Sequence, residues 1–102
     1  MHALVLLAPS GLSSSDELAD EHERFIDGLI ARHRVVLGGD WDPPVAGFEA
    51  AYLLGCASLD EAREIAGSDP FVRGGSMRFE VVEWRLVGVD PDAVDRDSLL
   101  YP

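Results

Sequence analysis

The chain has 102 residues, of which 47% are hydrophobic and 26% charged, and its formal net charge is −11. This length suits one domain with a single hydrophobic core. All eight cationic residues are Arg, and the acidic balance disfavours nucleic acids and anionic membranes as partners, because both attract clustered positive charge.

The first apolar run, residues 2–8, is bounded by Pro9-Ser10-Gly11 and predicts a buried strand. Its apolar core has no basic segment before it and is too short for a signal peptide or a membrane span. We therefore expect a cytoplasmic protein. The single Cys56 lies among apolar residues, which predicts a buried thiol and no internal disulfide.

The next segment predicts an amphipathic helix that ends near Arg32. Ser14 is the expected N-cap, with Glu17 three residues later completing a capping box. Apolar side chains and one histidine then recur at spacings of three and four, which places them on one face of the helix: Leu18, His22, Phe25, Ile26, Leu29 and Ile30.

Two strands follow this helix. Residues 34–37 predict a strand that Gly38-Gly39 closes, and residues 48–54 predict another. Between them we expect an irregular loop, because Pro43-Pro44 should prevent regular pairing.

The last part of the chain contains a second helix and a final strand. Ser58 and Glu61 form a capping box for a helix that Gly67 ends, and residues 77–86 predict the strand. We divide the chain into a domain, residues 1–88, and an acidic C-terminal tail, residues 89–102, with at most one helical turn beginning at Pro91.

The order strand, helix, strand, strand, helix, strand predicts an α+β fold, a ferredoxin-like sandwich with a four-stranded antiparallel sheet. The last strand is apolar on both sides, with Met77, Phe79 and Val81 on one and Val82, Trp84 and Leu86 on the other. Two helices cover only one face of such a sheet. We therefore predict a homodimer in which the uncovered sheet faces pack together.

Metal and cofactor sites find little support in the sequence. His22 and His33 would lie roughly 16 Å apart along a continuous helix, too far to share an ion. The pairs Gly38-Gly39 and Gly74-Gly75 lack the Lys of a nucleotide-binding loop. We expect neither a metal nor a cofactor.

His22 and Asp69 are the candidates for chemistry, and each has two interpretations. His22 is either a half-buried structural residue or a general acid/base in a cleft beside the sheet. Asp69 precedes Pro70, an arrangement typical of a helix N-cap. Asp69 could instead orient His22, since the first helix and the end of the second share one face of the sheet.

Four stretches of the chain carry a resemblance to the YCII family (YciI-like proteins) of the dimeric α/β-barrel superfamily: "HERFIDGL", "RVVLGGDW", "SLDEAREIAGSDPFVRGG" and "MRFEVVEWRL". The resemblance implies a ferredoxin-like protomer that dimerises into an α/β barrel, with His22 and Asp69 as catalytic residues. One branch of the family resembles a dehydrochlorinating lyase that acts on a hydroxylated, chlorinated aromatic compound. Asp40, where many members have Pro, and the Pro43-Pro44 loop depart from the family pattern.

Three functions remain open at this point. The first is a lyase or isomerase in which His22 and Asp69 abstract a proton from a small cyclic or phenolic substrate. The second is a small-molecule-binding or accessory module without chemistry, and the third is a structural dimer. Trp41, Phe71 and Tyr52 could line a substrate pocket or belong to the core, and Arg73 could bind an anionic group or be solvated.

Overall fold

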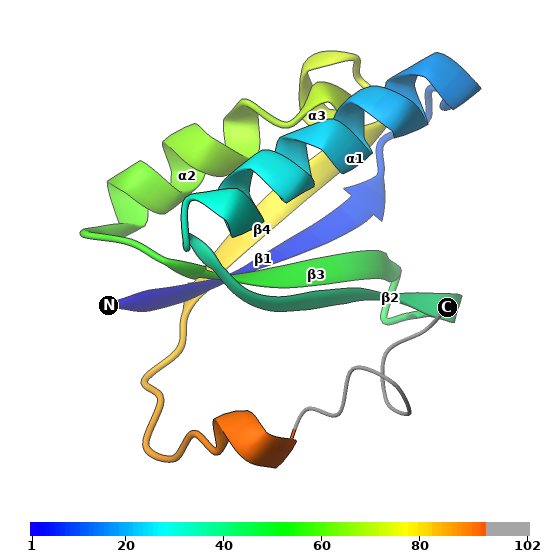
Figure 1. Cartoon of the computed structure of the whole chain (residues 1–102). Coiled ribbons are helices and arrows are strands. Elements are labelled where there is room, and N and C mark those ends of the chain that lie inside the picture. The colour runs from blue at the N-terminus through cyan, green and yellow to red at the C-terminus, as the bar shows by residue number, and fades with distance from the viewer. Residues whose placement is uncertain (94–102) are drawn as a thin grey trace.

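The computed structural model of the protein describes residues 1–93. Its elements in chain order are β1 (His2–Pro9), α1 (Asp16–Ala31), β2 (Val35–Val45), β3 (Phe48–Gly55), α2 (Leu59–Gly67), α3 (Pro70–Arg73), β4 (Met77–Glu83) and the short 3-10 helix η1 (Pro91–Ala93). The strands form one antiparallel sheet of order β2-β3-β1-β4. The helices α1, α2 and α3 lie on one side of it (Figure 1). The predicted ferredoxin-like α+β fold is confirmed.

Serine side chains begin the two long helices. The predicted cap at Ser14 is wrong by one residue, because Asp16 is the first helical residue and Ser15 therefore precedes it directly. The Ser15 hydroxyl accepts a hydrogen bond from the backbone N–H of Leu18 at 3.1 Å. Ser58 caps α2 as predicted and accepts from the backbone N–H of Glu61 at 3.1 Å.

The loop predicted around Pro43-Pro44 is wrong, since β2 continues through both prolines to Val45. The pairing with β3 is nevertheless interrupted there, with a register shift between Asp40 and Val45. Proline is tolerated because β2 is an edge strand, where a missing N–H costs no sheet hydrogen bond on the open side. At the other edge, β4 ends at Glu83, three residues earlier than predicted.

The hydrophobic core lies between the sheet and the helices. Its fully buried members are small and medium apolar side chains from both layers, including Val5, Leu7, Leu29, Leu54, Ala62 and Ala66. Met77, Phe79 and Val81 pack against this cluster. Burying one face of a sheet under amphipathic helices is the main source of stability in such a fold.

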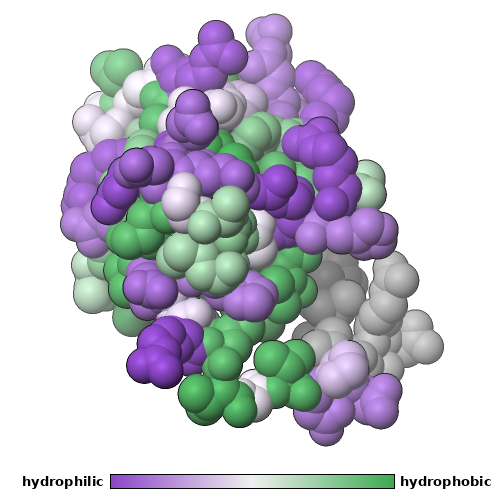
Figure 2. All heavy atoms as spheres, turned by 90° about the vertical axis from the view of Figure 1, so that its left-hand side faces the viewer, coloured by the Kyte–Doolittle hydropathy of each residue, from purple (hydrophilic) through white to green (hydrophobic). Residues whose placement is uncertain are grey.

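The other face of the sheet, which no helix of the α1–α3 layer covers, is partly exposed. The register places Val82 opposite Leu4, and Leu37 opposite Leu53, on this face. Val82, Leu37 and Trp84 are each about half exposed. Figure 2 shows polar residues over the helix layer and apolar residues gathered lower down, around the sheet and the chain after β4.

The segment after β4 runs below the open face and ends in η1 (Figure 1). The single helical turn expected from Pro91 is present, and the remainder of the predicted tail, residues 94–102, lies outside the described residues. None of the described helices combines the length and the apolar character that crossing a membrane requires.

The buried position of Leu54 makes it a test of this core. Leu54→Ala should lower the free energy of unfolding by about 2–5 kcal/mol, because it removes apolar contacts and leaves a cavity. Urea denaturation at a fixed protein concentration measures the loss. The control Val87→Ala, at a position 98% exposed, should change it by less than about 0.5 kcal/mol. Equal losses of unfolding free energy in the two variants would contradict the assignment of Leu54 to the hydrophobic core.

Candidate functional site

Asp69 is fully buried and begins the short helix α3. Its Oδ1 accepts a hydrogen bond from the backbone N–H of Phe71 at 2.9 Å, and Pro70 occupies the first helical position. Proline fits there because the N–H that it lacks would have no partner inside the helix. The structural interpretation of Asp69 as a helix cap is therefore correct.

The same carboxylate also meets His22. The Nδ1 atom of His22 lies 2.8 Å from Oδ1 and 2.9 Å from Oδ2 of Asp69, although 47 residues separate the two in sequence. An ionised carboxylate only accepts hydrogen bonds, so Nδ1 carries the proton and donates it. In the neutral ring Nε2 then has a free lone pair. Asp69 thus acts as a helix cap and as the partner of His22.

Phe71 helps to fix the plane of the His22 ring. The two rings stack with centroids 4.4 Å apart and an interplanar angle of 26°. Because the N–H of Phe71 also binds Asp69, α3 holds the carboxylate and the imidazole in one arrangement. Phe71 does not line the cavity beside His22 but packs against the ring.

His22 lines a cavity of about 300 Å³ between α1 and the β2 side of the sheet. This volume is at the lower end of the range of small-molecule sites. The walls come from α1 (His22, Ile26, Ile30), β2 (Val35, Gly38, Gly39, Asp40), and β1 and β3 (Leu7, Ala50, Ala51, Tyr52). The lining is therefore mostly apolar, with polar groups from only three of these side chains.

Gly38 keeps this part of the sheet compact. It lies opposite Tyr52 in the register of β2 and β3. A methyl group on Gly38 would lie 3.1 Å from Cβ of Tyr52 and 3.3 Å from the carbonyl oxygen of Ala51. A larger residue at this position would crowd Tyr52 and the adjoining cavity wall.

Tyr52 contributes a polar group that the sequence interpretation treated only as part of an apolar wall or of the core. Its side chain is 3% exposed, and its hydroxyl has no hydrogen-bond partner among residues 1–93. Burial raises the pKa of this hydroxyl, and the negative charge of Asp69 raises it further. The hydroxyl therefore keeps its proton at neutral pH and is an unused donor.

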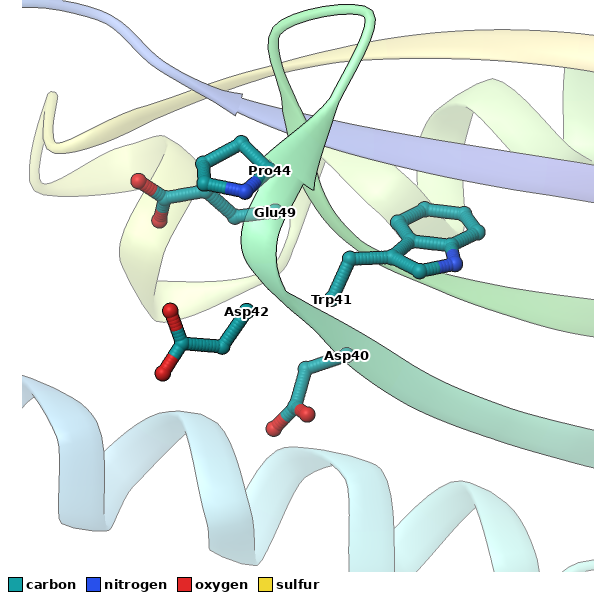
Figure 3. A pocket seen from close by; sticks show the side chains of 5 residues that line it. All are labelled: Asp40, Trp41, Asp42, Pro44 and Glu49. Carbon is teal, nitrogen blue, oxygen red and sulfur yellow. The ribbon is translucent and has the colours of Figure 1, made fainter.

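Two of the predicted substrate-binding residues lie elsewhere. Trp41 is on β2 and, with Pro44 and three acidic residues, lines a second hollow of about 700 Å³ (Figure 3). Arg73 is exposed and lines a third hollow with Leu18 and Pro70. The structure brings His22, Asp69 and Phe71 together, but neither Trp41 nor Arg73 lines the His22 cavity.

The polar side chains that line the cavity are those of His22, Asp40 and Tyr52; the Asp40 carboxylate is exposed, whereas the Tyr52 hydroxyl is buried. Within residues 1–93, no three His, Cys, Asp or Glu side chains are arranged to hold a metal ion. An oriented imidazole beside an apolar cavity can accept and return a proton.

The two roles of Asp69 can be separated with two variants. Asp69→Ser retains a capping hydroxyl but is too short to reach His22, whereas Asp69→Ala loses both contacts. We expect Asp69→Ala to be less stable than Asp69→Ser by about 1 kcal/mol, a typical N-cap contribution. In both variants the neutral His22 ring should lose its preference for the Nδ1–H tautomer.

Imidazole ¹⁵N chemical shifts measure this tautomer, and the exposed His33 is an internal reference. An unchanged His22 tautomer in Asp69→Ser would show that the carboxylate does not orient the ring.

Comparisons with known proteins agree with this fold. The YCII-related domain family matches residues 2–85. The uncharacterized protein YjpA of Bacillus subtilis (strain 168) is 31% identical over 86 residues, which cover 84% of this chain and 98% of YjpA. The structure of 5-chloro-2-hydroxyhydroquinone dehydrochlorinase from Burkholderia phenoliruptrix AC1100, in complex with 2,5-dihydroxybenzoquinone, is similar with a TM-score of 0.58 and 18% identity, over 83% of this chain and 94% of that one. The family match and the relative together show that the chain belongs to the YCII family.

Proposed function

We propose that this protein is an acid/base enzyme, a lyase or isomerase, that acts on a small cyclic or phenolic substrate. The observation that carries the proposal is the contact of His22 Nδ1 with both oxygens of the buried Asp69, while the His22 ring lines a cavity. A histidine held by a carboxylate is a common form of a general base. The dehydrochlorinase of similar fold supports this class of reaction.

In the proposed mechanism, Nε2 of His22 takes a proton from the bound substrate. The electron pair left on the substrate then either expels a leaving group, as in a lyase, or takes a proton back at another atom, as in an isomerase. Asp69 holds the ring in the Nδ1–H tautomer and stabilises the imidazolium that forms. The mostly apolar walls of the cavity strengthen this charge interaction.

We further propose that the protein works as a homodimer joined through the open sheet face. Leu37, Val82 and Trp84 on or beside that face are about half exposed. Contiguous apolar surface of this kind is typical of an interface, and a second copy supplies a matching surface.

The cytoplasm is the compartment that we propose. Cys56 is buried and unpaired, whereas small secreted domains commonly depend on disulfides.

The catalytic role of His22 is tested by screening hydroxylated and halogenated aromatic compounds for turnover. For a compound that reacts, His22→Ala should lower kcat about 10²- to 10⁴-fold, the usual contribution of a general acid/base, while binding remains. The control His33→Ala changes an exposed histidine outside the cavity and should leave kcat unchanged.

A ligand that binds without turnover, with an affinity that His22→Ala does not change, would instead favour the non-catalytic binding module. Loss of kcat with intact binding supports the enzyme.

The dimer is tested by placing a charge on the open face. Val82→Asp should shift the protein to a monomer at micromolar concentration, because the carboxylate would be buried without a partner in the interface. Sedimentation velocity measures the shift. Leu12→Asp, at a position 65% exposed on the loop before α1, should leave the dimer intact. A monomeric wild type would contradict the proposal.

A further inference from the structure

Asp40 stands where the His22 cavity meets the larger hollow on β2. It lines both the cavity of about 300 Å³ and the hollow of about 700 Å³. In Figure 3 its side chain leaves the strand toward α1, the helix that carries His22, whereas the Trp41 ring leaves on the other side. A ligand that enters the cavity from this hollow passes the Asp40 carboxylate.

The charges around this entrance all have one sign. Asp42 and Glu49 line the larger hollow together with Asp40. Among residues 1–93 no Arg lines either cavity, and the chain contains no Lys. An anionic group at the entrance would therefore meet repulsion, with no Arg among residues 1–93 lining the entrance to offset it.

Besides charge, hydrogen bonding limits which ligands the cavity can bind. The Tyr52 hydroxyl is a buried donor without a partner among residues 1–93, and it keeps its proton at neutral pH. Nε2 of the neutral His22 is an acceptor. A hydroxyl group on a ligand can donate to Nε2, whereas an apolar ligand would leave Nε2 unsatisfied; the Tyr52 hydroxyl itself is buried away from the cavity surface.

We infer that the His22 cavity takes an uncharged or cationic small molecule that carries hydroxyl groups, and that Asp40 is the residue that discriminates against anions. The inference rests on the proposed function, because it names the substrate class of the same site. An enzyme that binds an anionic ligand would have the opposite charge preference. Arg73, which from the sequence could bind an anionic group or be solvated, is exposed and lines another hollow.

Two probes of similar size test the inference. Hydroquinone is uncharged at neutral pH, whereas 2,5-dihydroxybenzoquinone, the compound bound in the dehydrochlorinase structure, is an acidic quinone that is anionic there. NMR titrations of the wild type give both dissociation constants, and the His22 ring signals report whether the probe occupies the cavity. We expect hydroquinone to bind more tightly than the anionic quinone.

The variant Asp40→Asn removes the charge with little change of shape. It should tighten binding of the quinone by about tenfold and change that of hydroquinone less than about twofold, since only the anion feels the charge. Asp42→Asn is the matched control, because it removes the same charge from the larger hollow but not from the His22 cavity. Its effect on the quinone should be smaller.

Equal effects of Asp40→Asn on both probes, tighter wild-type binding of the quinone, or no binding of hydroquinone in the cavity would each overturn the inference. Selective binding of hydroquinone with no turnover of any tested compound would support it and would count against the proposed enzyme. The two proposals can therefore fail separately.

Discussion

The buried carboxylate of Asp69 is the group on which both the fold and the candidate chemistry depend. A fully buried charge is tolerated only when hydrogen bonds and a partner compensate for lost hydration. Asp69 obtains these from the N–H of Phe71 and from Nδ1 of His22. One side chain therefore begins α3, joins α3 to α1, and sets the tautomer of the only histidine that lines the small cavity.

This arrangement divides the candidate site into two parts with different origins. The His22, Asp69 and Phe71 group comes from helices that the sheet supports, and the YCII family resemblance covers these residues. The entrance comes from the edge strand β2, whose pairing with β3 is interrupted between Asp40 and Val45. Edge strands tolerate prolines and irregular pairing. Residues of this strand such as Asp40 can thus differ without disturbing the contact between His22 and Asp69.

Many local features follow from the sequence alone. The capping serines, the Asp69-Pro70 helix start and the apolar stripe of α1 act through residues three or four positions apart, so their pattern is readable without a structure. The element order was sufficient to predict the ferredoxin-like fold. The predicted cap of α1, Ser14, was nevertheless wrong by one residue. Three consecutive serines offer the same capping hydroxyl, and Ser15 is the one that caps the helix.

What the tertiary structure decided depends on contacts between distant segments. His22 and Asp69 were candidates by pattern, but only packing of α1 against α3 shows that they touch. The strand register places Gly38 opposite Tyr52, and the Tyr52 hydroxyl has no hydrogen-bond partner among residues 1–93; neither fact has a local signal. That Trp41 and Arg73 line other hollows also depends on register and packing, which the local sequence does not reveal. Sequence periodicity determines which residues share a face, whereas register and packing decide which of them meet.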